Sequence, residues 1–230
     1  MSRVPADFRL EATKRDSRSP RLACEAGRRG GGVHISRALR ASALLCVALT
    51  FLACGPSAVP AKSAEIEGPK HVSTPAGVSF STVCTPTGAE ICFNAVDDNC
   101  NGVIDEGCGM GTGVLQWEIA WGDSPAEVEL VVTDPAGDRL TDANRSTPSG
   151  LHLDHVCPKD GCHGQNVDNV FFEGRDPPQG HYTVAVKLID PKGATLPLKV
   201  QFGWKVGGRS SGAELLIASP DDKKEFSFEL

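Results

Sequence analysis

The stretch "HYTVAVKLID", residues 181–190, decides the fold, because apolar and polar residues alternate along it. An alternation with a period of two places every second side chain on the same face of a β-strand. Tyr182, Val184, Val186 and Leu188 therefore share one face, which we expect to point into a hydrophobic core.

Similar short segments surround this strand, and turn sequences separate them. The expected strands include "VELVVTD" (128–134), "LPLKVQFGW" (196–204), "AELLIAS" (213–219) and "KEFSFEL" (224–230), and the turns are "DPAG" (134–137), "DPPQG" (176–180) and "DPKG" (190–193). No segment shows a helical repeat of about ten residues or more. We expect an all-β fold: one antiparallel β-sandwich of about seven or eight strands over 114–230.

The same segment carries a family resemblance. The stretches "WEIAWGDSPAEVELVVTDPAGDRL", "SGLHLDHV", "DNVFFEG" and "PPQGHYTVAVKLID", within residues 114–206, resemble the YfaP-type β-sandwich domain of bacteria. The resemblance implies a fold and assigns no activity.

Charge divides the chain into two parts. Residues 1–53 contain ten Lys and Arg against four Asp and Glu, so this part has a net charge of +6 and leaves −12 for the remainder. The acidic remainder lacks the basic patch that nucleic acids require, so we expect no nucleic-acid partner.

The basic part ends in a signal for export. Arg37 and Arg40 precede an apolar run over 41–53, which is too short to span a bilayer but is typical of a signal peptide. A translation start at Val33 would give this signal an ordinary length, and residues 1–32 would then not belong to the protein.

The sequence "FLAC", which ends at Cys54, resembles the lipobox of bacterial lipoproteins. This resemblance implies that Cys54 carries lipid and that the protein is an outer-membrane lipoprotein of the cell envelope, held at the membrane by its anchor only. Ordinary cleavage and release is the alternative. Residues 54–82, rich in Pro, Ala and Ser, are expected to be a disordered tether.

Six cysteines lie beyond the expected anchor, and an oxidising compartment favours their pairing. Four of them belong to a small unit over residues 83–108, and two lie farther along the chain; they are Cys84, Cys92, Cys100, Cys108, Cys157 and Cys162. Four cysteines allow three pairings. We expect Cys92–Cys100 nested within Cys84–Cys108, followed by a flexible joint at 109–113.

The stretch "DDNCNGVIDEGC", residues 97–108, follows the ligand order of an EF-hand-type calcium loop. Oxygen ligands are expected at alternating positions, with Gly102 at the sharp turn and Ile104 as an apolar anchor. The candidate ligands are Asp97, Asn99, Asn101, the Val103 carbonyl, Asp105 and Glu106. The alternative is a turn without an ion, because Asp, Asn and Gly also favour turns.

Residues 84–108 also resemble the metal-binding motif of secreted bacterial proteins named after the copper protein MopE. The matching residues are Glu90, Cys92, Asp97, Asp98, Cys100, Gly102, Asp105 and Glu106. The unit contains neither His nor Met, and copper prefers imidazole, thiolate or thioether ligands. We therefore expect Ca²⁺, with copper or zinc as alternatives.

A second candidate metal site is "HLDHVCPKDGCHG", residues 152–164. His152, His155 and His163, with Cys157 and Cys162, have the donor types for zinc or copper. The alternative is a Cys157–Cys162 disulfide with histidines at the surface, which export favours.

Motifs for a catalytic serine, a zinc protease or a phosphate-binding loop do not occur in the sequence. We therefore expect no enzyme. The sequence favours a calcium-stabilised lipoprotein whose β-sandwich binds an unknown protein or envelope partner. The competing hypothesis is a lipoprotein that binds copper or zinc through residues 152–163.

Overall fold

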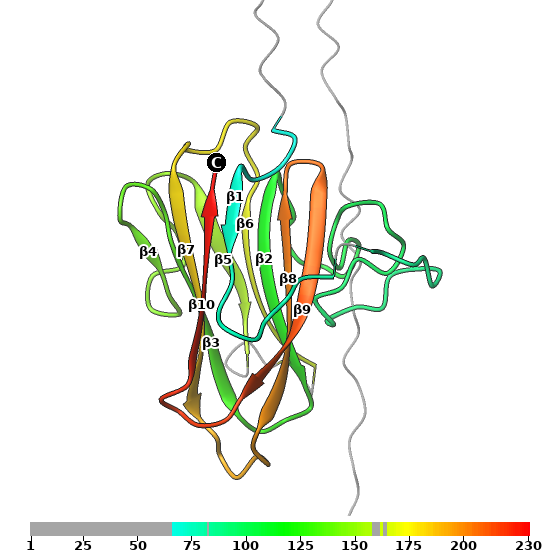
Figure 1. Cartoon of the computed structure of the whole chain (residues 1–230), viewed down its shortest axis with the longest axis vertical. Helices are drawn as coiled ribbons and strands as arrows, with labels where there is room; N and C mark the ends of the chain where they lie inside the picture. Colours follow the sequence, from blue (N-terminus) through cyan, green and yellow to red (C-terminus); the bar gives the residue numbers. More distant parts are fainter. Residues whose placement is uncertain (1–65, 82, 158–161, 163–164) are drawn as a thin grey trace, which may run out of the picture. The chain divides into compact units, whose positions relative to one another are not determined.

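Two five-stranded antiparallel sheets packed face to face form the fold (Figure 1). The computed structural model describes residues 66–81, 83–157, 162 and 165–230, which all fall within one unit, 58–230. The expected leader, Cys54 and the first part of the expected tether lie outside the described residues.

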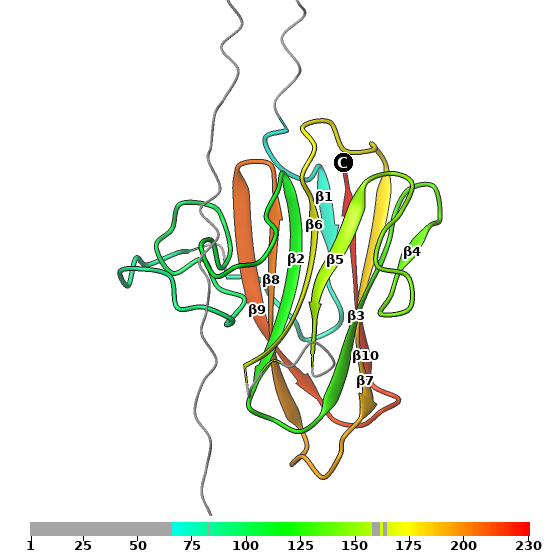
Figure 2. The same cartoon turned by 180° about the vertical axis from the view of Figure 1, so that it is seen from behind.

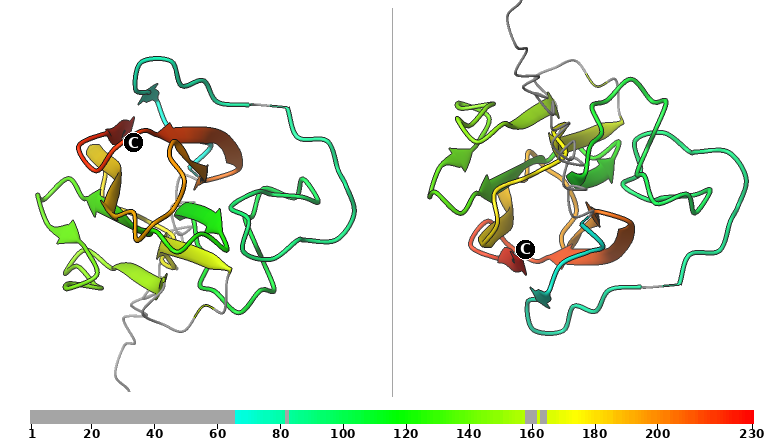
Figure 3. Two further views of the ribbon diagram at one scale, coloured as in Figure 1. Left: turned by 90° about the horizontal axis from the view of Figure 1, so that it is seen from below. Right: turned by 90° about the horizontal axis from the view of Figure 1, so that it is seen from above.

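Sheet A contains, in spatial order, β1 (His71–Ser73), β10 (Lys223–Glu229), β7 (His181–Asp190), β3 (Glu127–Thr133) and β4 (Arg139–Leu140). Sheet B contains β5 (Leu151–Val156), β6 (Asn166–Phe172), β2 (Leu115–Gly122), β8 (Leu198–Val206) and β9 (Arg209–Ile217). The views from behind and along the strands show the same two layers (Figures 2 and 3). The prediction of an all-β antiparallel sandwich is confirmed.

The core between the sheets is rich in aromatic side chains. Trp117, Tyr182, Phe202, Phe226 and Phe228 are all fully buried, and the rings of Phe202 and Phe226 stack with centroids 4.3 Å apart. Each such side chain contributes about 1.5–3 kcal/mol through burial. The four alternating residues that the sequence placed on one face of β7 are all buried in this core.

The folded domain begins earlier than the sequence predicted. Strand β1 pairs with β10, and Ile66, Val72 and Phe80 pack against the core. The ring of Phe80 stacks on Phe226 with centroids 5.5 Å apart. The expected tether over 54–82 is therefore wrong for residues 66–81, because their apolar side chains have a hydrophobic surface to cover.

The middle of the outer face of sheet B is covered, whereas residues such as Lys199 and Leu216 on the same sheet are exposed. Residues 83–113, which we call the cysteine-rich unit, lie beside β8 and β9 on this face (Figure 1). Strand β2 is consequently buried on both faces over nearly its whole length. Two glycines, Gly203 and Gly212, face each other in the register of β8 and β9. A Cβ at Gly203 would overlap the backbone of Ala95, so the glycine permits close docking.

The expected flexible joint at 109–113 is also wrong. The amide of Gly111 donates to Oδ2 of Asp154 over 2.7 Å, and its carbonyl accepts from Asn169 over 2.8 Å. Lys205 donates to the Gly113 carbonyl over 2.6 Å, and a Cβ at Gly113 would overlap Phe172. These glycines allow the backbone to lie directly against sheet B, so they fasten the cysteine-rich unit rather than uncouple it.

Within the part of the chain that the structure describes, none of the segments is a helix with the length and apolar character needed to cross a membrane.

Candidate metal-binding unit

Two interlaced disulfides hold the cysteine-rich unit. They join Cys84 to Cys100 and Cys92 to Cys108, each across 16 residues. The expected nested pairing is therefore wrong. Phe93 and Cys100 have left-handed φ angles of 67° and 63°, so the chain between Cys92 and Cys100 turns repeatedly and does not form a simple hairpin.

Side-chain oxygens at alternating positions point toward the inside of the 97–103 loop, where they accept hydrogen bonds from its backbone amides. The two carboxylate oxygens of Asp97 accept hydrogen bonds from the amides of Asn101 and Gly102, at 3.1 and 2.9 Å. Oδ1 of Asn99 accepts from the Asn101 amide, and Oδ1 of Asn101 accepts from the Val103 amide, both at 2.9 Å. Gly102 has a φ of 88°, which agrees with the predicted sharp turn.

Glu106 closes this loop from its C-terminal side. Oε1 of Glu106 accepts hydrogen bonds from the side-chain amides of Asn99, at 2.5 Å, and of Asn101. Its second oxygen, Oε2, is buried and has no hydrogen-bond partner in the structure. The structure thus brings four of the predicted ligand residues together: Asp97, Asn99, Asn101 and Glu106.

Glu90 joins the same group, although the sequence pointed to it only as part of the MopE-type motif. Its Oε1 accepts the Asn99 amide at 3.0 Å, and its Oε2 is buried without a partner. Burial raises the pKa of Glu90, and the nearby charges of Glu106, Asp97 and Asp98 raise it further, against a lowering by the Asn99 amide. The loop therefore concentrates negative charge.

Asp98 has a structural role in this unit. Its Oδ2 accepts hydrogen bonds from the Ile91 amide at 3.2 Å and from the Asn94 side chain at 2.8 Å. Thr87 donates to the other oxygen at 3.3 Å. These contacts fasten the first half of the unit to the loop.

Asp105 faces away from the predicted ion position. Its Oδ2 accepts hydrogen bonds from the amides of Asn94 and Ala95, at 3.1 and 3.0 Å, and its side chain is fully buried. Among the described residues, no group of three or more His, Cys, Asp or Glu side chains is placed to hold a metal ion. The predicted carboxylates Asp97, Asp105 and Glu106 are therefore not gathered as one set. Any ion at the loop depends on carboxamide and carbonyl oxygens as well.

The docking contacts reach the loop itself. Ser210 on β9 donates to Oδ2 of Asp97 over 2.9 Å, and Gln116 on β2 donates to the Ile104 carbonyl over 3.1 Å. The Ile104 side chain is buried and would contact a Cβ at Gly203. The predicted apolar anchor of the loop thus packs on sheet B.

At the second candidate metal site, the two cysteines are oxidised and two of the histidine rings lie against aromatic side chains. Cys157 and Cys162 form a disulfide, as the export argument favoured, so neither sulfur is a thiolate. The ring of His152 lies against Phe171 and that of His155 against Phe93, with centroids 5.6 and 5.9 Å apart. His163 lies outside the described residues. The copper or zinc hypothesis therefore loses the thiolate ligands on which it depended.

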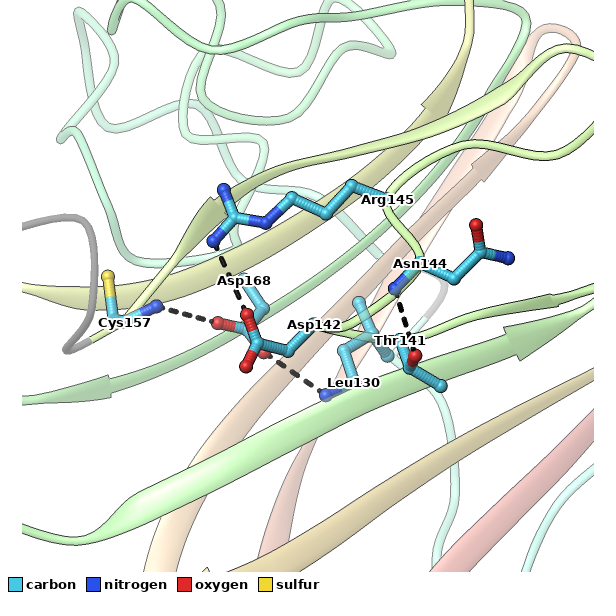
Figure 4. A network of polar contacts seen from close by, with 7 residues as sticks. All are labelled: Leu130, Thr141, Asp142, Asn144, Arg145, Cys157 and Asp168. Atoms are coloured by element: carbon cyan, nitrogen blue, oxygen red, sulfur yellow. Dashed lines mark hydrogen bonds and ion pairs between the residues drawn. The ribbon is translucent and has the colours of Figure 1, made fainter.

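Beside this disulfide, Asp168 links the two sheets (Figure 4). Its oxygens accept the amide of Cys157, at 3.0 Å, and the amide of Leu130 on β3, at 3.1 Å. Burial raises the pKa of Asp168 to about 8, although these two amides oppose the rise. The Asp142–Arg145 ion pair of 3.3 Å lies close by. Both oxygens of Asp168 are satisfied by backbone donors, so we assign it a structural role.

The chain matches no protein-family model, and the searches of curated proteins and of solved structures likewise found no match.

Proposed function

We propose that the protein is a non-enzymatic, exported lipoprotein of the cell envelope whose disulfide-stapled loop binds Ca²⁺ and whose β-sandwich binds a partner. The candidate calcium ligands are the side chains of Asp97, Asn99, Asn101 and Glu106, with the Val103 carbonyl and Glu90. All of these groups offer oxygen, which is the donor that Ca²⁺ prefers.

The observation that carries this proposal is the pair of buried carboxylate oxygens without partners, Oε2 of Glu90 and Oε2 of Glu106. A buried acceptor without a donor is costly, and a buried charge is more so. Both carboxylates reach Asn99, so they approach the loop from two sides. A calcium ion would neutralise this charge and satisfy the free oxygens together.

The hydrogen bonds seen within the loop are compatible with such an ion. A carboxamide oxygen has two lone pairs, so Oδ1 of Asn99 or Asn101 can accept a backbone amide and still offer an electron pair to a cation. The loop amides thereby hold the oxygens in position. Because the bidentate Glu of a strong EF-hand is replaced by Cys108, we expect an affinity of about 10⁻⁴ to 10⁻³ M, as in extracellular modules.

The proposed export and anchoring depend on the sequence over residues 1–54. The two disulfides of the cysteine-rich unit and the Cys157–Cys162 bond are consistent with an oxidising compartment. We propose that the partner binds sheet A, because the cysteine-rich unit already covers the middle of the outer face of sheet B. The outer side of sheet A carries mixed charges, such as Lys187 beside Glu129 and Lys223.

Calorimetric titration of the oxidised, chelator-treated protein with Ca²⁺ tests the loop site. We expect binding at submillimolar to millimolar Ca²⁺ that Glu106→Gln weakens strongly. The exposed Asp221 provides a control, since Asp221→Asn removes a charge that is not in the loop. A wild-type protein without heat of binding at millimolar Ca²⁺ would leave the loop as a disulfide-stapled turn.

A further inference from the structure

Three polar side chains are fully buried where the cysteine-rich unit meets sheet B. Asp105 comes from the unit, and Gln116 and Glu118 come from the outer face of β2. The carboxyl group of Asp105 lies next to that of Glu118. The amide group of Gln116 lies against Glu118, with Nε2 3.1 Å from Oε2.

Each of these side chains has one oxygen without a hydrogen-bond partner: Oδ1 of Asp105, Oε1 of Gln116 and Oε1 of Glu118. The orientation of the Gln116 amide is fixed by its surroundings. Its nitrogen faces three acceptors, which are the Ile104 carbonyl, Oε2 of Glu118 and Oδ1 of Asn169. A flipped amide would place oxygen against all three, so the unpartnered atom is the oxygen.

The groups that most influence Glu118 are Asp105, Asp154 and Gln116, two of which are acidic. The cationic side chain opposite Gln116, Lys205 on β8, donates its hydrogen bond to the Gly113 carbonyl. Two buried carboxylates in contact are strongly unfavourable unless a proton or a cation lies between them. One shared proton would join the two carboxyl groups but would leave the Gln116 oxygen without a donor.

We propose that a hard divalent cation, of which Ca²⁺ is the expected example, binds here between Asp105, Gln116 and Glu118. Carboxylate and carboxamide oxygens are ligands for Ca²⁺ or Mg²⁺ rather than for copper or zinc. This interface site is separate from the loop site, because the loop is formed by Asp97, Asn99, Asn101 and Glu106. The ion cross-links the cysteine-rich unit to β2.

The site binds protons in competition with the cation. Burial raises the pKa of Glu118 well above its usual range, and the neighbouring Asp105 raises it further. Ca²⁺ binds the ionised form of a carboxylate, so protons and the ion compete for the oxygens of Asp105 and Glu118. Affinity falls as the pH falls, because metal binding and protonation compete for the same oxygens.

Counting bound ions tests the proposal. Calcium titration and native mass spectrometry of the oxidised full chain, first treated with chelator, should give two Ca²⁺ per wild-type chain. Glu118→Gln should lose the interface ion and keep the loop ion, whereas Asp97→Asn should show the opposite. Glu214→Gln, an exposed carboxylate on β9, is the matched control and should still bind two.

The outcomes separate this proposal from the loop proposal. One ion that Glu118→Gln removes and Asp97→Asn does not would support the interface site and overturn the loop site. One ion that only Asp97→Asn removes would overturn the interface site and indicate a shared proton between Asp105 and Glu118.

A measurement on folded protein covers the case in which Glu118→Gln fails to fold. Calorimetry of Asp97→Asn, in which Glu118 is intact, measures Ca²⁺ binding at the interface site alone. We expect one Ca²⁺ per chain in this variant. An absence of Ca²⁺ binding in this variant would overturn the proposal.

Discussion

The hydroxyl of Ser210 on β9 donates a 2.9 Å hydrogen bond to Oδ2 of Asp97, the first residue of the candidate calcium loop. The two residues are 113 positions apart in the sequence. This contact makes the loop a neighbour of the sandwich, so a change in one can affect the other. It also argues against the expected flexible joint, which would have left the loop independent of the sandwich.

Replacing Ser210 should loosen the docking of the cysteine-rich unit. Ser210→Ala removes a donor from a partly buried carboxylate, so we expect a loss of about 1 kcal/mol in the free energy of unfolding. Urea denaturation of oxidised protein measures this loss. Ser227→Ala, on β10 of the other sheet, serves as the control, and equal stability of the two variants would contradict the proposed role.

Replacing Asp97 should weaken Ca²⁺ binding. Asp97→Ala removes the first ligand, so we expect Ca²⁺ binding at the loop to weaken at least tenfold, about 1.4 kcal/mol. Asn101→Ala should weaken it less, because a neutral amide contributes no charge. Calorimetry on each variant in the Glu118→Gln background isolates the loop site. Unchanged affinity in Asp97→Ala would mean that other ligands hold the ion.

The disulfide pairing can be read directly from peptides. Non-reducing digestion and mass spectrometry should find Cys84 linked to Cys100 and Cys92 linked to Cys108. Removing the second bond with Cys92→Ala and Cys108→Ala together should destabilise the unit by about 3 kcal/mol, as expected for a loop of this length. A Cys92–Cys100 peptide would show instead that the nested pairing is correct.

Asp168 should make stability depend on pH. Its pKa is about 8 in the folded protein and 3.8 as an isolated side chain, so the folded state binds more protons between these values. The free energy of unfolding should therefore fall as the pH rises from about 4 to about 8. Denaturation of wild type and Asp168→Asn across this range measures the contribution.

In Asp168→Asn this part of the pH dependence should disappear. At about pH 4, where folded Asp168 is protonated, the variant should be less stable by about 1–3 kcal/mol, because a carboxamide oxygen cannot replace both acceptors for Leu130 and Cys157. This deficit should shrink as the pH rises, because only the wild type has to ionise a buried carboxyl group. Asp123→Asn, an exposed substitution after β2, is the control. A pH profile of Asp168→Asn that overlays the wild type would assign the dependence to another group.

The proposed anchor is tested by expressing the protein in a bacterial host. Cys54→Ser removes the sulfur that would carry lipid, so we expect the protein to remain unprocessed or to leave the membrane fraction. Membrane fractionation and the mass of the mature N-terminus provide the measurement. Unaltered fractionation and an unaltered N-terminus would show that Cys54 is not lipidated.

The sequence was sufficient to predict the two-layer fold because alternation is a local property. Each strand carries its own pattern, as 181–190 does, and turns such as "DPAG" define the ends of strands without long-range information. The turn of the loop from Asp97 to Gly102 was readable for the same reason, because its hydrogen bonds join residues close in the sequence. The carboxylate of Asp105 was misplaced, since it bonds to the amides of Asn94 and Ala95 instead.

The burial of Gln116 and Glu118 could not be predicted in this way. In "LQWEIAW", residues 115–121, they alternate with apolar residues and therefore resemble the solvent-facing side of a strand. Only the docked cysteine-rich unit turns this side into an interior. Glu118 belongs to a row of paired residues that crosses all five strands of sheet B and comes from distant segments of the sequence. The row consists of Asp154, Asn169, Glu118, Gly203 and Gly212.

By itself, the sequence determined the strands, their inward faces and the oxygen-rich loop, since each depends on neighbouring residues. The tertiary structure alone decided the disulfide pairing, the position of Asp105 beside Glu118 and the docking of the loop on Ser210. These features depend on which surfaces meet after the chain has folded. Burial makes an uncompensated charge unfavourable in free energy, and this penalty is the basis for the cation sites proposed above.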